Sequence, residues 1–303
     1  MSLYGLFYRI FLIATELIPY RALYQIGKLM GLIFYLTPNK HKRISLENLN
    51  LIFPDLTRKE LNKLLKESLF HSSMNILESG MVWGSKKYIK DRKFIEVRNF
   101  DLIKNSISQN KGVLLFTPHL GNIEILINYL GSKFEAIIPY TKPKSNTLDR
   151  VITKSRNEAG VKMVPAVASG IRTILSALKE KKLIAIASDQ VPKKGNGSFS
   201  KFFNKEIYSM TLLPKLQEKT DCKVHLMYCE RKKNASGFVI HFKESIDLKH
   251  GTQEGIDRMN IEFEKCIMEL PGQYAWEYKK FKRTSLQSIY KRQLNNSKHL
   301  LTI

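Results

Sequence analysis

The feature that most constrains this fold is a series of short apolar segments that alternate with helical segments between residues 113 and 187. Four apolar segments have the length of buried strands, at 113–116, 136–140, 162–164 and 183–187. Helices of about 10–15 residues are expected between them, over 123–130, 147–159 and 170–179. This alternation predicts an α/β fold with a mostly parallel central sheet flanked by helices.

The residues after 187 are expected to complete the sheet. A stretch rich in Gly, Asn and Lys at 191–206 predicts a polar loop. The alternating segments 223–228 and 238–242 surround a turn at 234–237 and predict a C-terminal antiparallel hairpin. Three further helices are expected, at 56–83, 212–219 and 256–268.

The N-terminal segment, residues 3–36, is rich in Leu, Ile, Phe and Tyr and predicts contact with a membrane. It lacks the roughly 18 uninterrupted apolar residues of a simple span, because charged side chains divide it at Arg9, Glu16, Arg21 and Lys28. Pro19 is expected to separate two helices. We expect residues 1–38 to form a membrane-anchor region, tilted through the bilayer or lying in its interface. Two amphipathic helices packed on the domain are the alternative.

This segment is followed directly by the basic residues Lys40, Lys42 and Arg43. Positive charge at that place predicts that the rest of the chain lies on the cytoplasmic side. Residues 39–284 show no repeat and no linker, and are expected to form one domain. Residues 285–303 are basic and rich in Asn, which predicts a poorly ordered tail.

The chain is strongly basic, with 50 Lys and Arg against 27 Asp and Glu and a net charge of +23. Such a charge favours anionic partners, such as nucleic acid, an anionic membrane, an acidic carrier protein or a phosphorylated substrate. A nucleic-acid-binding protein is therefore an alternative, although no recognisable motif for it accompanies the dispersed charge. We expect neither a metal site nor a disulfide framework, because zinc-ligand spacing is lacking at Cys222, Cys229 and Cys266.

The strongest local motif is the segment 113–124, VLLFTPHLGNIE, in which a buried strand ends just before His119. Ligands of open α/β sheets bind beyond the carboxyl ends of strands, where His119 is expected. Gly121 and Asn122 suit a turn that would bring Glu124, in the first helical turn, to the imidazole. A carboxylate beside an imidazole fixes its tautomer and leaves the second nitrogen free to deprotonate a hydroxyl. A purely structural His–Glu pair is the alternative. Asp189 follows the strand at 183–187 and is expected at the same edge.

His119-x4-Glu124 resembles the HxxxxD/E signature of the glycerolipid acyltransferase superfamily. Further segments, in order from about residue 4 to 284, resemble one branch, the lipid A late acyltransferases of lauroyl and myristoyl type. They are Arg43-x4-Asn48-Leu49 with Phe53-Pro54-Asp55, Glu78-x-Gly80-x2-Trp83, Pro139-Tyr140-Thr141-Lys142-Pro143 with Asn146, Ser188-Asp189-Gln190, Gly197-x-Phe199-x2-Phe202-Phe203, Pro271-x2-Tyr274-x-Trp276 and Lys280-Phe281-Lys282. Lys142 stands where the family has Arg, and Asn204 where it has Gly.

The resemblance implies an acyltransferase in which His119 is the general base and Glu124 orients it. The donor would be an acyl thioester on acyl carrier protein, and the enzyme would need no cofactor. A hydroxyl of a lipid A precursor would attack the thioester directly, without an acyl-enzyme. The resemblance also implies residues that bind acceptor or donor, namely Gly121, Asn122, Tyr140, Lys142, Asn146, Asp189 and Gln190.

The same resemblance implies a place in the cell. Residues 39–284 would be an acyltransferase domain on the cytoplasmic face of the bacterial inner membrane, in contact with inner-membrane lipids and not with nucleic acid. A lysophospholipid or other glycolipid acyltransferase is the alternative.

Overall fold

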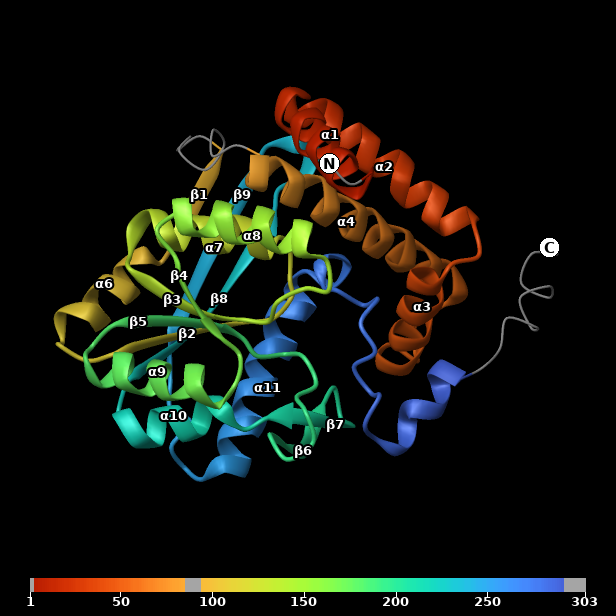
Figure 1. Cartoon of the computed structure of the whole chain (residues 1–303). Coiled ribbons are helices and arrows are strands. Elements are labelled where there is room, and N and C mark those ends of the chain that lie inside the picture. Colours follow the sequence, from red (N-terminus) through yellow and green to blue (C-terminus); the bar gives the residue numbers. More distant parts are fainter. Residues whose placement is uncertain (1–2, 85–93, 292–303) are drawn as a thin grey trace.

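Seven strands form the central sheet of the protein, which a computed structural model describes over residues 3–84 and 94–291 (Figure 1). In spatial order they are β1 (Ile95–Arg98), β9 (Phe238–Ile246), β8 (Lys223–Arg231), β2 (Val113–Thr117), β5 (Leu183–Ala187), β3 (Ala136–Tyr140) and β4 (Lys162–Pro165). All neighbours run parallel except β8 and β9, the predicted antiparallel hairpin, whose turn contains η1 (Lys233–Ala235). The predicted α/β architecture is therefore confirmed.

Helices cover both faces of the sheet, which explains why the central strands are apolar throughout. Every residue of β2 is buried. Leu114 and Phe116 join the core on one face of the sheet, and Val113 and Leu115 join the core on the other. The helices of the first face are α9 (Ala168–Lys179), α10 (Leu212–Thr220) and α11 (Thr252–Glu269), and those of the second are α7 (Ile123–Lys133) and α8 (Asn146–Glu158).

Four N-terminal helices gather along one side of this core, α1 (Leu3–Leu17), α2 (Tyr20–Leu36), α3 (Lys40–Ile52) and α4 (Arg58–Gly84) (Figure 1). Pro19 separates α1 from α2, as predicted. The backbones of α2 and α4 approach closely, since a Cβ on Gly31 would lie 2.6 Å from Cα of Phe70. Among the helices of residues 3–84 and 94–291, none combines the length and apolar character that a membrane span requires. The predicted anchor is thus not supported as a spanning segment.

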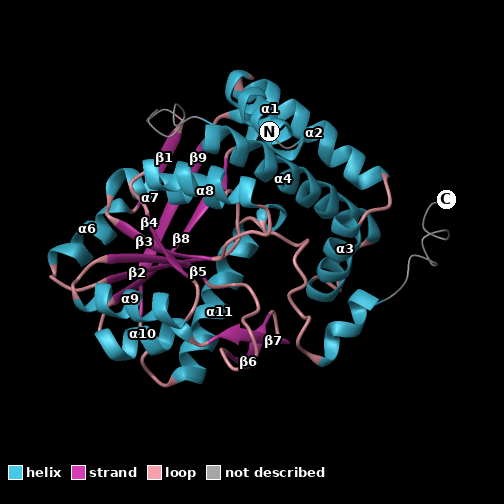
Figure 2. Cartoon of the chain, in the orientation of Figure 1, coloured by secondary structure: helices cyan, strands magenta, loops and turns pink. Residues whose placement is uncertain are grey.

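Two regions differ from the sequence-based expectation. The expected polar loop at 191–206 instead contains most of a second, two-stranded sheet, β6 (Gly197–Phe202) and β7 (Lys205–Met210), which lies apart from the main sheet in Figure 2. Its turn consists of Phe203 and Asn204, both with positive φ (48° and 57°), a geometry that suits a two-residue hairpin. Neither β1 nor α6 (Phe100–Ser108) was expected from the sequence.

The first part of the expected tail is packed on the domain. Residues Ser285–Lys291 form the short helix η3. The element that precedes it along the chain is the short helix η2 (Pro271–Gln273). The hydroxyl of Tyr290 is buried and donates to Oδ1 of Asn48 at 2.6 Å. The basic composition predicted a poorly ordered tail, and it took no account of the aromatic ring of Tyr290 that is buried on the domain. The remainder of the expected tail, 292–303, lies outside the described residues.

Candidate active site

The candidate site lies at the carboxyl edge of the sheet, where β2 and β5 end beside each other. Thr117 of β2 is paired with Ala187 of β5, and Ser188 N donates to Thr117 O at 3.2 Å just beyond that pair. His119 and Asp189 each follow two residues after the pair. Parallel register therefore brings them to the same level of the edge, as expected for Asp189.

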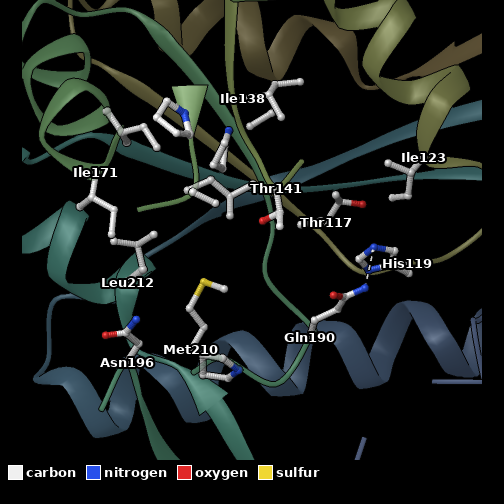
Figure 3. Close-up of a pocket in the computed structure, with 18 of the residues that line it drawn as sticks. Thr117, His119, Ile123, Ile138, Thr141, Ile171, Gln190, Asn196, Met210 and Leu212 are labelled. Atoms are coloured by element: carbon white, nitrogen blue, oxygen red, sulfur yellow. Dashed lines mark hydrogen bonds between the residues drawn. The ribbon is translucent and has the colours of Figure 1, made fainter. Parts of the chain in front are cut away.

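His119 and Asp189 form a hydrogen-bonded pair. Nδ1 of His119 lies 2.6 Å from Oδ1 of Asp189, and the backbone N–H of His119 donates to Oδ2 at 3.0 Å. Because a carboxylate only accepts, Nδ1 carries the proton and Nε2 is the basic nitrogen of the neutral ring. The side-chain amide of Gln190 lies 3.2 Å from Nε2 and donates to it (Figure 3). The imidazole is 32% exposed and the carboxylate 4%, so only the ring is open to a substrate.

Burial and charge together set the proton affinity of this pair. Burial disfavours the imidazolium, but the Asp189 carboxylate outweighs that effect, so the pKa of His119 is raised above its usual value. Burial also disfavours ionised Asp189, yet attraction to His119 and Lys280 holds the pKa of Asp189 far below its usual range. The imidazole thus faces a carboxylate that stays ionised.

Two residues from the C-terminal segment surround Asp189. The Lys280 ammonium is buried and donates to the backbone carbonyl of Asp189. Burial lowers the pKa of Lys280 to about 8, and Asp189 opposes that change. The buried hydroxyl of Tyr274 also hydrogen-bonds the carboxylate; burial and this negative charge raise the pKa of Tyr274 well above its usual value.

The turn between β2 and α7 fixes the direction of His119. Gly121 has φ of +62°, and a Cβ there would lie 1.6 Å from the carbonyl oxygen of Cys229, so only glycine fits. Asn122 is the N-cap of α7, because its Oδ1 accepts from the backbone N–H of Glu124 (2.8 Å) and Ile125 (3.2 Å). Both residues have the turn-forming role that the sequence predicted.

The predicted contact between Glu124 and His119 is corrected by the structure. The Glu124 carboxylate contacts Arg156 of α8, with Nη2 to Oε1 at 2.5 Å and Nε to Oε2 at 3.3 Å. Glu124 lies in the first turn of α7, and its side chain reaches α8 rather than the imidazole. The two carboxylates therefore have different partners.

Of the other predicted residues, Tyr140 lies next to Arg156, and Lys142 shares a carboxylate partner with Tyr140. The guanidinium carbon of Arg156 lies 5.2 Å from the centre of the Tyr140 ring. Tyr140 donates to Asp149 at 3.1 Å, and burial together with this bond raises the pKa of Tyr140 to about 12. Lys142 pairs with the same carboxylate at 3.5 Å but is 63% exposed. Asn146 is exposed in the first turn of α8.

An apolar pocket of about 570 Å³ adjoins the His119–Asp189 pair. His119 and Gln190 lie at one end of it in Figure 3, and Ile171 and Leu212 lie toward the other. Arg156 also lines the pocket. Most of the remaining lining is aliphatic, including Ile123, Leu126, Ile138, Ile174 and Met210. Such a space suits a flexible hydrocarbon chain whose polar end lies beside His119.

Sequence reasoning missed the role of Arg156. Its signal was available, because Arg156 follows Ile152 by four positions and both lie on the buried face of the amphipathic helix α8. The Phe side chains of the 197–204 region are not among the residues that line the pocket. Phe202 is buried in the core, and Phe199 is half exposed beside Tyr208, with ring centres 5.2 Å apart. Within residues 3–84 and 94–291, no group of three or more His, Cys, Asp or Glu could hold a metal ion.

Known proteins are similar to this chain over most of its length. The sequence profile of the family described as bacterial lipid A biosynthesis acyltransferase matches residues 2–283. The chain is similar to the lipid A biosynthesis palmitoleoyltransferase of Escherichia coli K12, with 26% identity over 270 residues, 88% of this chain and 86% of the relative. It is also similar to a lipid A biosynthesis acyltransferase of Haemophilus influenzae, with 28% identity over 272 residues, 88% of this chain and 86% of the relative. The lipid A biosynthesis lauroyltransferase of E. coli K12 is 23% identical over 271 residues, 88% of this chain and 87% of the relative.

Proposed function

Because the chain belongs to the family of bacterial lipid A biosynthesis acyltransferases, we propose that it moves a fatty acyl group from an acyl carrier protein thioester to a hydroxyl of a lipid A precursor. Acyl transfer is the activity of the family. The donor, the mechanism and the membrane geometry are the proposal. The observation that carries it is the basic Nε2 of His119 at one end of a mostly apolar pocket.

His119 acts as the general base in this proposal. The acceptor hydroxyl gives its proton to Nε2 while its oxygen attacks the thioester carbonyl carbon. The carbon–sulfur bond then breaks, and the carrier thiolate takes the proton from the imidazolium. Asp189, rather than Glu124, fixes the tautomer and stabilises the imidazolium. No acyl-enzyme forms, and the acyl thioester is the only co-substrate.

Arg156 supplies positive charge to the lining of the same pocket. Its guanidinium remains charged, and Glu124 fixes its direction through two hydrogen bonds. We assign Arg156 to the negative charge that develops on the thioester carbonyl oxygen. Glu124 is then a positioning residue for Arg156, and Lys142, exposed beyond Tyr140, faces acceptor phosphates.

The acyl chain occupies the aliphatic part of the pocket. Burial of each methylene contributes about 0.8 kcal/mol. A length difference of one methylene changes discrimination by about 1–3 kcal/mol. Side chains toward the other end of the pocket, such as Ile171 and Leu212, are thus expected to limit chain length.

The α1–α2 pair attaches the enzyme to the inner membrane in this proposal, with the pocket on the cytoplasmic side. One face of each helix packs toward α4, and the other face exposes large apolar side chains. On α1 these are Leu6, Phe7, Ile10, Ile13 and Leu17, and on α2 they are Ile26, Leu29, Leu32, Ile33 and Leu36. Amphipathic helices of this kind bind in the plane of the interface without crossing it.

A vesicle assay tests the attachment. Leu29→Gln with Leu36→Gln is expected to weaken binding to vesicles of anionic phospholipid, measured by flotation, because two buried apolar contacts with lipid are lost. Ile261→Gln with Met268→Gln changes two exposed apolar residues of α11 and serves as the matched control. Equal binding by both variants would contradict the attachment through α1–α2.

Two measurements test the reaction. Purified enzyme in vesicles should acylate a tetra-acylated lipid A precursor with acyl carrier protein thioesters, and His119→Ala should form no product above background. Mass spectrometry of lipid A from cells with and without the gene should show one acyl chain fewer without it. Unchanged lipid A, or wild-type turnover by His119→Ala, would overturn the substrate assignment or the mechanism, respectively. Equal turnover with acyl-CoA would overturn the carrier-protein donor alone.

A further inference from the structure

A fully buried ion pair lies directly behind the catalytic turn. Glu78 of α4 and Arg231 of β8 both have no exposed side-chain surface. Nε of Arg231 donates to Oε1 of Glu78 and Nη2 donates to Oε2, each at 2.5 Å. The guanidinium makes two more hydrogen bonds. Nη1 lies 2.5 Å from Nδ1 of His71, and Nη2 lies 2.7 Å from Oδ1 of Asn75. Burial is the main effect that lowers the pKa of His71 to about 4, so its ring is neutral and accepts.

The carboxylate of this pair reaches the catalytic turn through Asn122. Oε2 of Glu78 accepts a hydrogen bond from Nδ2 of Asn122 at 3.0 Å. The other end of the same amide, Oδ1, accepts from the backbone N–H groups of Glu124 and Ile125. Glu78 therefore fixes which way the Asn122 amide points, and with it the first turn of α7.

The backbone of Arg231 reaches the same turn by a second route. Its N–H donates to Oε1 of Gln273 at 2.7 Å, and its carbonyl accepts from Nε2 of Gln273 at 3.0 Å. The backbone carbonyl of Gln273 accepts from the N–H of Gly121 at 3.0 Å, and two residues on, Ala275 N donates to the His119 carbonyl at 3.0 Å. The turn from His119 to Asn122 is thus fixed from both sides by groups bonded to the ion pair.

Helix α2 joins the network at its N-terminal end. The hydroxyl of Tyr20 donates to Oε1 of Glu78 at 2.7 Å. Tyr20 is buried against Phe94 and Phe238, with ring centres 4.9 and 5.8 Å away. Helix α2, whose outer face is exposed and apolar, is therefore connected to the first turn of α7. The connection consists of three hydrogen-bonded side chains, those of Tyr20, Glu78 and Asn122.

Stability alone does not account for a buried pair of this kind. Removing two charges from water costs about as much as their attraction returns, so apolar residues of similar volume are commonly as stable or more stable. A defined arrangement of neighbouring polar groups is what the pair adds, and here those groups belong to the turn of His119.

We propose that Glu78 and Arg231 are positioning residues for acyl transfer, which fix the His119–Asn122 turn through Asn122 and Gln273 and connect it to α2 through Tyr20. The inference rests on the proposed function only for its kinetic readout. Neither residue touches the pocket, so their loss affects the rate of the chemical step rather than the binding of the acyl donor.

The decisive variant is the double replacement Glu78→Leu with Arg231→Met, which removes both charges together. Folding is expected to persist with a lower melting temperature than wild type, because no single charge is left buried although Tyr20, His71 and Asn122 each lose a hydrogen-bond partner. We expect kcat to fall about tenfold to a hundredfold, since a displacement of about 1 Å has effects of that size, with KM for the acyl donor unchanged. A folded double variant with wild-type kcat would overturn the proposal.

Tyr20→Phe is the conservative variant, and it remains informative if the double variant does not fold. It removes one hydrogen bond to Glu78 and should lower kcat about threefold, which corresponds to about 0.65 kcal/mol of activation free energy. Tyr24→Phe, one turn later on α2, is the matched control. The Tyr24 ring is buried against Phe70, and among the described residues no hydrogen bond of its hydroxyl is found. Equal kcat in the two variants would contradict the connection to α2.

A substrate-free readout separates this proposal from the proposed function. Diethyl pyrocarbonate modifies exposed neutral imidazole, and its reaction with His119 can be followed by mass spectrometry. His119 should react faster in the double variant than in wild type or Tyr24→Phe, because the turn is less firmly fixed. Unchanged reactivity would contradict the positioning role, even if wild-type enzyme proved inactive on lipid A precursors.

Discussion

Asp189 and Glu124 are two buried carboxylates, but one contacts a titratable base and the other a permanent cation. Asp189 bonds both Nδ1 and the backbone N–H of His119, whose ring is open to the pocket. Glu124 bonds Arg156, and both side chains are nearly closed to solvent. In this site, the register of β2 and β5 determines which carboxylate pairs with His119, and nearness in sequence does not.

The largest effect that separates the two carboxylates is expected for Asp189→Asn. The amide cannot stabilise the imidazolium and permits the wrong imidazole tautomer, so kcat should fall by about 10²–10⁴. Steady-state kinetics with acyl carrier protein thioester would measure the loss. An activity near that of wild type would show that Asp189 takes no part in the mechanism. The proposed difference between Asp189 and Glu124 would then be wrong.

A smaller loss is expected for Glu124→Gln. The amide oxygen still accepts from Arg156, but the guanidinium loses its counter-charge and its fixed direction, so kcat should fall about tenfold. The pH at which activity rises should stay as in wild type, because Glu124 does not contact the base. A shift in that pH would show that Glu124 acts on His119 after all.

The smallest expected effect is a shift in the pH at which activity rises. Activity requires neutral His119, so kcat/KM should rise with pH through the pKa of His119, which Asp189 raises. The Lys280 ammonium disfavours the imidazolium, so Lys280→Met should raise this pKa and move the rise in activity to higher pH by about half a unit.

Lys282→Met is the matched control for that profile, since Lys282 is exposed two residues away and its ammonium contacts the Tyr278 hydroxyl. It should leave the profile in place. A shift to lower pH in Lys280→Met, or equal shifts in both variants, would contradict the role assigned to Lys280.

The sequence predicted the fold better than it predicted the pairing within the site. The runs at 113–116 and 183–187 became β2 and β5 because uniformly apolar segments of that length are stable only between two helical layers. The position of Asp189 followed from the same reasoning. The partner of Glu124 did not, because it depends on how α8 lies against α7, and no periodicity encodes that packing.

Two further differences have physical causes of the same kind. The 191–206 stretch looked like a loop because Gly, Asn and Lys dominate it, yet Phe202 is buried beneath the C-terminal segment and gives one strand an anchor. The N-terminal helices were expected at a membrane from their composition. One face of each helix also packs closely on α4, through Gly27 and Gly31 of α2 and through Gly80 and Gly84 of α4 itself, a fit that only the three-dimensional arrangement reveals.

Register between β2 and β5 has a consequence for how this enzyme would lose function. A slip of one residue between the two strands would move Asp189 about 3.3 Å along the strand direction and turn its side chain to the opposite face. The helical content would hardly change, whereas the bond to His119 would be gone. Catalytic turnover should therefore report small disorder at the centre of the sheet before circular dichroism or tryptophan fluorescence detects any unfolding.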